Sequence, residues 1–196
     1  MLAAMSSTTA IPDWNTSGII PPIRPGQPGH SAERSPYKAT LMEIIDRFGT
    51  HADRLSILEG YLAFRAALHG VGLAAGVQWL DGSFVEDKEA RGGRSPADID
   101  VVTFSYLPHG KTQADVFSMN PTLFDHSHVK KTYKVDGYFQ FLGKSSDERF
   151  LRQTSYWNSM WSHTRHLEWK GFLEVDLDPV RDADAVTYLS ALKATF

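Results

Sequence analysis

The sequence predicts an α/β fold of the α+β kind, in which a small mixed β-sheet carries packed helices and follows two helices and a proline-rich N-terminal arm. Three observations predict this class. Two stretches with helical spacing of apolar residues come first, four strand-like stretches follow them, and six of the ten prolines lie before residue 37. With 196 residues, the chain has the size of one ordinary domain.

Residues 1–36 are predicted to form an extended arm, because prolines recur through them and exclude a helix. We expect the first ten residues to be disordered. The rest of the arm is expected to lie over the domain or to reach a partner protein. Residues 37–196 are predicted to form the single folded domain.

Two helices are predicted at the start of this domain. Thr40 and Glu43 have the spacing of a capping box, the apolar residues after them recur at helical intervals, and Gly49 ends the pattern. A second capping pattern at Thr50–Asp53 is expected to begin a helix that ends at Gly70. The first strand is therefore predicted to come after two helices.

Four strands are predicted from apolar runs and from alternation. Residues 77–80 form a short, mostly apolar run that ends at a turn, and residues 98–107 are rich in β-branched and aromatic side chains. Residues 132–141 alternate most clearly, and residues 172–177 form the last strand-like run. The two faces expected for the alternating strand are Tyr133, Val135, Phe139 and Phe141 on the apolar side and Lys134, Asp136, Tyr138 and Gln140 on the polar side.

Three further helices are predicted between and after these strands. Residues 113–124 form a weak helical pattern that Pro121 interrupts. A third capping box at Ser145–Glu148 is expected to begin a helix with Trp157 and Trp161 in the core, and residues 186–192 are predicted to form the closing helix.

Composition and charge exclude several classes of protein. Twenty Lys and Arg against 23 Asp and Glu give a formal net charge of −3, so a polyanion would have to bind a local site. The absence of cysteine excludes thiolate catalysis, cysteine-based zinc sites and disulfides. The sequence has neither an apolar run of membrane-spanning length nor a signal-peptide pattern, and we therefore expect a cytoplasmic protein with no membrane contact.

The residues with the clearest chemistry lie between positions 80 and 102. Asp98 and Asp100 stand at i and i+2 on a predicted strand, so their carboxylates project from one face. Like charges this close repel unless a cation lies between them, and oxygen ligands on one face suit Mg²⁺ or Mn²⁺. Gly82 and Ser83 form a turn whose backbone and hydroxyl are suited to hold phosphate.

These residues resemble the fingerprint of the nucleotidyltransferase superfamily of the polymerase-β type. That fingerprint is a Gly-Ser turn, a spacer, Asp-x-Asp on a strand, and a third carboxylate on a neighbouring strand. The matching residues are Gly82, Ser83, Asp98, Asp100 and, as the third carboxylate, Asp136. Two departures are a longer spacer of 14 residues, 84–97, and Asp81 where an apolar residue is common. Other phrases of the chain resemble small bacterial nucleotidyltransferase-like proteins.

The resemblance implies a nucleotidyltransferase-like fold and an Mg²⁺- or Mn²⁺-dependent reaction. A nucleoside monophosphate would move from an NTP such as ATP to a tRNA or protein acceptor, and pyrophosphate would leave. Asp98 and Asp100 would ligate two metal ions, and Asp136 would complete the acceptor-side metal and act as general base. Small members of this superfamily serve toxin–antitoxin or antiphage systems.

Several alternatives stay open. Glu174 and Asp176 also stand at i and i+2 on a predicted strand and compete with Asp136 for the third position. The same fold with an impaired site would give a non-catalytic protein that acts through a partner bound by the arm. A metal phosphohydrolase that uses the same carboxylates is a third hypothesis.

A basic stretch of the sequence predicts either a phosphate cradle or an ordinary solvated surface. From it we take Lys134 and Arg149 as candidate nucleotide-binding residues. Its members are Lys130, Lys131, Lys134, Lys144, Arg149 and Arg152, and Lys170 is a further candidate for phosphate contact. The histidine pairs do not have the spacing of a zinc motif, so no zinc site is predicted.

Overall fold

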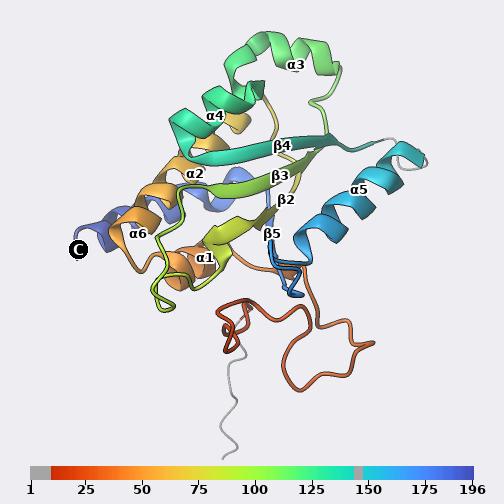
Figure 1. Ribbon diagram of the computed structural model, residues 1–196. Coiled ribbons are helices and arrows are strands. Elements are labelled where there is room, and N and C mark those ends of the chain that lie inside the picture. Colours follow the sequence, from red (N-terminus) through yellow and green to blue (C-terminus); the bar gives the residue numbers. More distant parts are fainter. Residues whose placement is uncertain (1–9, 144–147) are drawn as a thin grey trace, which may run out of the picture.

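The computed structural model describes residues 10–143 and 148–196 (Figure 1). Of the first ten residues, which we expect to be disordered, residues 1–9 lie outside this range. The capping box at Ser145–Glu148 begins outside it, and Lys144 of the basic stretch also lies outside. Within the described residues the fold is α/β, with a five-stranded mixed sheet and six α-helices.

The sheet has the strand order β1-β5-β2-β3-β4. Its strands are β1 (Tyr37–Lys38), β2 (Gly76–Asp81), β3 (Ile99–Ser105), β4 (Val135–Phe141) and β5 (Leu173–Asp176). Strand β2 is antiparallel to both β3 and β5, whereas β3 and β4 are parallel, as are β1 and β5. The mixed sheet predicted from the sequence is therefore confirmed. The prediction that two helices precede the first strand is wrong, because the two-residue strand β1 pairs with β5 and lies before the first helix.

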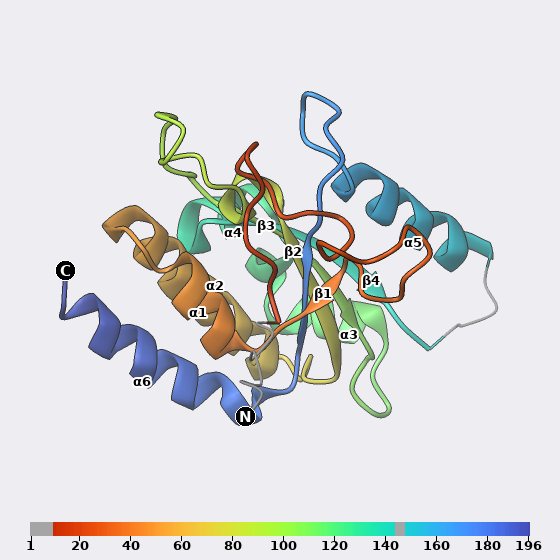
Figure 2. The same cartoon turned by 90° about the horizontal axis from the view of Figure 1, so that it is seen from below.

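Helices cover both faces of this sheet (Figures 1 and 2). They are α1 (Leu41–Phe48), α2 (Ala52–Gly70), α3 (Gln113–Met119), α4 (His126–Tyr133), α5 (Glu148–Trp161) and α6 (Asp182–Lys193). The larger core lies between one face and α1, α2, α4 and α6. On the other face, Trp161 of α5 packs on a smaller aromatic core with Trp79, Val102, Phe104 and Phe172.

The first two helices begin differently. Thr40 and Glu43 form the capping box predicted for α1, and each satisfies a backbone N–H of the other residue. The box predicted at Thr50–Asp53 is wrong, because α2 begins at Ala52 with His51 as its N-cap and no side-chain cap bond. Thr50 stands one residue too early to cap this helix.

The strand predicted over residues 132–141 is three residues too long, because helix α4 precedes it. Asp125 caps α4 by accepting a hydrogen bond from the His128 N–H at 2.6 Å. Lys134 ends the helix in the left-handed conformation at φ 55°, so β4 begins only at Val135. The period-2 alternation runs into the last turn of a helix that the sequence reasoning missed.

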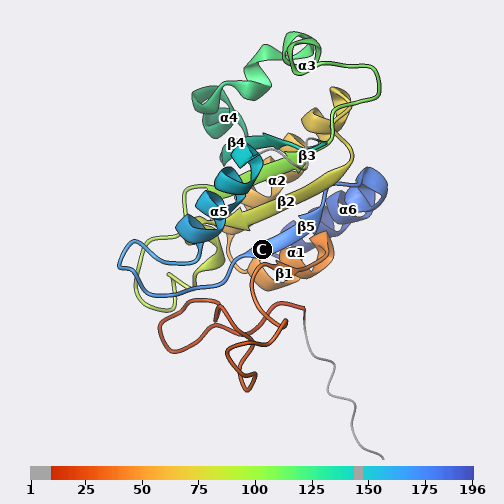
Figure 3. The same ribbon diagram turned by 90° about the vertical axis from the view of Figure 1, so that its right-hand side faces the viewer.

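The described part of the N-terminal arm, residues 10–36, packs against the domain beside the β1 edge of the sheet (Figure 3). Ile11, Ile19 and Ile20 are buried, and Trp14 Nε1 donates a hydrogen bond to the Val85 carbonyl at 2.8 Å. The arm therefore contributes apolar side chains to the fold. No helix in the described residues is long and apolar enough to cross a membrane.

Candidate functional site

Three aspartates form a row across neighbouring strands at one end of the sheet. In the register of the sheet, Asp81 of β2 pairs with Asp100 of β3, and Asp100 pairs with Asp136 of β4. Side chains at directly paired positions project from the same face. We call Asp81, Asp100 and Asp136 the acidic row; Asp98, two residues before Asp100, is placed beside it.

The acidic row lies on the face that carries the aromatic core and α5. The next residues inward on the same face are Trp79, Val102 and Tyr138, which are in register with one another. Trp157 stacks near Tyr138, with ring centroids 4.7 Å apart, and so covers this part of the face. The row is therefore the polar end of an otherwise apolar face.

A cleft of about 940 Å³ lies over the acidic row. Its walls come from the Gly82–Ser83 turn, from the loop of residues 86–97 and from the hairpin of residues 162–170. Figure 2 shows both loops projecting from the same end of the molecule. They carry cationic or titratable side chains that line the cleft: Lys88, Arg91, Arg94, His163, Arg165 and His166. The cleft thus combines an acidic floor with partly basic walls.

The electrostatics of the row show crowded negative charge. Burial, then the neighbouring carboxylates of Asp136 and Asp98, raise the pKa of Asp100 to about 6. Burial raises the pKa of Asp81 to about 7, although the Lys170 ammonium beside it acts in the opposite direction. Both carboxyls therefore hold protons more tightly than an ordinary aspartate.

Two lysines lie among these carboxylates. Lys170 Nζ is 3.0 Å from Asp81 Oδ1 and 3.2 Å from Glu86 Oε1. Lys130 Nζ, from α4, is 2.8 Å from Asp98 Oδ2 and 2.7 Å from Asp136 Oδ2. Each ammonium therefore bridges two acidic side chains of the cleft.

The Gly82–Ser83 turn is held close to the acidic row. Gly82 has φ +79°, and a Cβ built there would lie 2.4 Å from Asp100 Oδ2. The glycine is thus required by the aspartate beside it as well as by the turn. Ser83 follows in a short 3₁₀ helix, Gly82–Val85, and lines the cleft.

A buried arginine fixes the chain that follows this turn. Arg54 of α2 donates to the carbonyls of Phe84 and Glu86, both at 2.6 Å. It also contacts both carboxylate oxygens of Glu89, at 2.7 and 2.8 Å. These four hydrogen bonds of the Arg54 guanidinium hold the start of the 86–97 loop against the domain.

The structure does not bring Lys134 and Arg149 into the cleft. Lys134 is the left-handed C-cap of α4, and its Nζ donates to Ser56 Oγ of α2 at 2.9 Å. Arg149 lies near the start of α5, about 18 Å along the helix axis from Trp161, which does line the cleft. The prediction that these two residues share the site with the aspartates is not supported.

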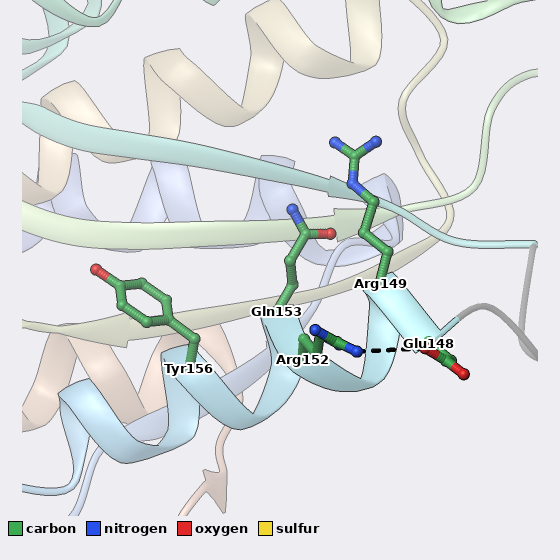
Figure 4. Close-up of a pocket in the computed structure, with 5 residues that line it drawn as sticks. All are labelled: Glu148, Arg149, Arg152, Gln153 and Tyr156. Carbon is green, nitrogen blue, oxygen red and sulfur yellow. Dashed lines mark hydrogen bonds and ion pairs between the residues drawn. The ribbon is translucent and has the colours of Figure 1, made fainter.

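Arg149 instead lines a separate hollow of about 480 Å³ on α5. Figure 4 shows Arg149, Gln153 and Tyr156 rising from the same side of that helix. Arg152 Nη2 and Glu148 Oε2 form an exposed pair at 3.3 Å within one turn. A hollow built from one helix has few convergent groups, so we place the candidate site at the cleft.

The structure also decides which acidic residues meet the Asp98–Asp100 pair. Asp136 does, through the register of β3 and β4. Glu174 lies in register with Trp79, one step inward from the row, and accepts a hydrogen bond from the Trp79 indole at 3.0 Å. Asp176 lies farther inward and pairs with Lys38 at 2.9 Å. The last strand therefore offers no third carboxylate here.

A family model of proteins of unknown function, DUF6932, matches residues 12–176. The chain belongs to DUF6932. The match begins within the N-terminal arm, includes the whole acidic row, the Gly82–Ser83 turn and Lys170, and ends with β5. No curated protein and no solved structure matches the chain.

The donor set of this DUF6932 cleft suits a hard divalent cation, because it consists of carboxylate oxygens. Asp136 Oδ1 is buried and accepts no hydrogen bond from a described residue, and the His126 imidazole lies 3.4 Å away. Among the residues that the structure describes, however, no three acidic or histidine side chains are spaced to hold one ion. The Lys130 ammonium lies between Asp98 and Asp136 instead.

Asp81 is the site residue that the sequence reasoning did not assign. It stood out only as a departure from the fingerprint, and its sequence neighbours gave no sign of its partner Lys170, 89 residues later. The available signal was a carboxylate at the end of an apolar strand, directly before the glycine of the turn. Such a residue is buried at the sheet's end and requires a cation.

Proposed function

We propose that this DUF6932 protein is a nucleotidyltransferase that moves a nucleoside monophosphate from an NTP to a hydroxyl of an RNA or protein acceptor, with Mg²⁺ or Mn²⁺. The observation that carries the proposal is the convergence of four aspartates and the Gly82–Ser83 turn on one cleft. Asp81, Asp100 and Asp136 lie on β2, β3 and β4, the turn follows β2, and Asp98 directly precedes β3. The polymerase-β-type fingerprint needs the turn, Asp98, Asp100 and Asp136 at one place.

The reaction makes one bond and breaks one bond at the α-phosphorus of the NTP. The acceptor oxygen bonds to phosphorus while the bond to the leaving pyrophosphate oxygen breaks, and the hydroxyl proton passes to a base. Asp136 is suited to be this base, since its Oδ1 is buried and accepts no hydrogen bond from a described residue. Bound at Asp98, Asp100 and Asp136, divalent cations would neutralise the charge that develops on phosphate.

The remaining residues position the nucleotide. Gly82 and Ser83 line the cleft, where the Ser83 hydroxyl is suited to donate to a phosphate oxygen. Lys88 and Arg94 line the same cleft and supply positive charge at its wall. Arg54 acts through the loop by holding the carbonyls of residues 84 and 86.

One observation favours a second candidate function, a catalytically impaired protein with the same fold that binds a partner. Lys130 already neutralises Asp98 and Asp136 at 2.8 and 2.7 Å. An ammonium fixed there would exclude a metal ion. The two candidates differ in whether this lysine can leave.

The test incubates the purified protein with each α-³²P-labelled NTP, Mg²⁺, and RNA or protein from a cell extract. We expect label to become covalently attached to one acceptor class and pyrophosphate to be released. Asp100→Asn should abolish transfer, whereas Asp176→Asn, on the same sheet face but away from the row, should retain it. Release of inorganic phosphate without transfer would indicate a hydrolase, and neither product would favour the binding protein.

A further inference from the structure

The two lysines of the cleft differ in how far they are enclosed. The side chain of Lys170 is 4 % exposed, and its partner Asp81 is 5 % exposed. The side chain of Lys130 is 45 % exposed, although its partners Asp98 and Asp136 are largely buried. Lys170 is therefore locked inside the protein, whereas Lys130 reaches the aspartates from the solvent side.

Lys130 has a path away from the carboxylates. It stands in the last turn of α4, a helix whose only buried residue is Val129. Its stem carries four flexible carbons, and an ion pair whose ammonium is reached by water costs less to open than a fully buried one. No covalent or backbone change is needed to move its ammonium into water.

Lys130 and a metal ion would compete for the same oxygen atoms. The ammonium lies within 2.8 Å of one oxygen each of Asp98 and Asp136. A divalent cation that binds these carboxylates approaches them to about 2.0–2.6 Å. Two cations cannot occupy that space together, because they would repel at short range.

We propose that Lys130 is an exchangeable counter-ion, whose ammonium holds Asp98 and Asp136 together in the metal-free protein and is displaced when a divalent cation binds. This inference rests on the proposed function for the identity of the cation. Because the metal must displace the Lys130 ammonium, the metal alone should bind weakly. A metal–nucleotide complex should bind more tightly, because its negative phosphates offer the displaced ammonium a new partner.

The experiment measures Mn²⁺ binding without nucleotide, by counting free Mn²⁺ with electron paramagnetic resonance. We expect Lys130→Met to lower the Kd for Mn²⁺ by about tenfold or more, because it removes a positive charge from the metal's position. Lys130→Arg keeps the charge and should bind Mn²⁺ as weakly as the wild type. Adding Asp136→Asn to Lys130→Met should abolish the gain.

Lys131→Met is the matched control, since residue 131 is exposed on the same helix and the substitution changes the net charge equally. We expect it to change the Kd by less than about twofold, because solvent screens an exposed charge. Thermal denaturation of each variant checks that the fold is kept.

Three results would overturn the inference. The first is that Lys130→Met binds Mn²⁺ no more tightly than the wild type, and the second is that Lys131→Met binds it as tightly as Lys130→Met. The third is that neither the wild type nor Lys130→Met binds Mn²⁺ at millimolar concentration. The proposed function fails separately. A protein that shows the expected Mn²⁺ pattern but never transfers a nucleotide keeps the role of Lys130 and loses the transferase activity.

Discussion

Arg54 and Arg65 are two buried arginines of α2, eleven residues or about three turns apart. Each contacts both carboxylate oxygens of one acidic residue, Glu89 for Arg54 and Asp182 for Arg65. The rest of their contacts differ. Arg54 binds the chain that follows the Gly82–Ser83 turn, whereas Arg65 binds Gln78 within the sheet and connects it to the start of α6.

The difference shows that α2 uses a buried, bidentate arginine–carboxylate pair in two places with different roles. The arginine near its start holds a loop of the candidate site, and the arginine in its second half holds the scaffold. The family match agrees with this division only in part, because it includes Arg65 but ends before Asp182. Substitutions at the two positions should therefore separate effects on the site from effects on the fold.

The largest expected effect is at the scaffold arginine. Arg65→Met removes the guanidinium that contacts both carboxylate oxygens of Asp182 and one of the two donors to Gln78 Oε1. It should lower the free energy of unfolding by about 3–5 kcal/mol, as measured by urea denaturation. Arg181→Met, which removes an exposed pair with Asp184, should change it by less than about 1 kcal/mol. Equal losses in both variants would remove the scaffold role of Arg65.

Removing a negative charge from the acidic row should raise the free energy of unfolding instead of lowering it. The pKa of Asp100 is raised from 3.8 to about 6, so the stability contributed by its protonated form is complete below pH 3.8 and is lost as pH rises through about 6. Asp100→Asn avoids this loss and should be more stable than the wild type above pH 6, by up to about 3 kcal/mol.

Denaturation curves of Asp100→Asn and wild type at pH 4 and pH 8 check this prediction, with the larger difference expected at pH 8. Asp182→Asn, at the scaffold end, should be less stable than the wild type at pH 8 because the buried Arg65 guanidinium would lose its negatively charged partner. A destabilised Asp100→Asn at pH 8 would show that the row is not strained by its charge.

Arg54→Met should cost less stability than Arg65→Met, about 2–3 kcal/mol, because Glu89 lies on a loop that water can reach when the Arg54 hydrogen bonds are lost. It should also weaken Mg²⁺–NTP binding, measured by calorimetry, since the 86–97 loop lines the cleft. An Arg54→Met protein with native nucleotide affinity would place the loop outside the site.

The smallest expected stability change is at the turn. Gly82→Ala puts a Cβ against Asp100 at a positive φ, and should destabilise the fold by about 1–2 kcal/mol. Gly70→Ala, at a position outside the cleft that has no positive φ and no atom within 4 Å of an added Cβ, is the comparison. We expect nucleotide affinity to fall only in Gly82→Ala, and equal affinities would reduce the turn to an ordinary loop.

Sequence reasoning predicted the parts of the fold that short-range patterns determine. The cap of α1 and the strands around Val77–Leu80 and Asp98–Leu107 follow from spacing and side-chain type. The meeting of Asp100 with Asp136 was expected only through the resemblance to the nucleotidyltransferase superfamily. The register of β3 and β4 places them side by side.

The rest depends on contacts between distant residues. The pairing of Asp81 with Lys170, and of Lys130 with Asp98, joins segments that no local pattern connects. Helix α4 has eight residues and one buried side chain, so its helical period is weak, and the clear alternation after it led to the prediction of a strand from residue 132. For the same reason Lys134 was expected on the polar face of that strand.

The most direct test of the proposed function compares nucleotide transfer by the wild type and by Asp100→Asn, with NTP labelled in turn at the α- and the γ-phosphate. We predict that the wild type attaches α-label to its acceptor and releases γ-label as pyrophosphate in equal amounts. The Asn variant, although more stable above pH 6, should do neither. Equal transfer by the two proteins, or no transfer by the wild type with any NTP and acceptor class, would contradict the proposal.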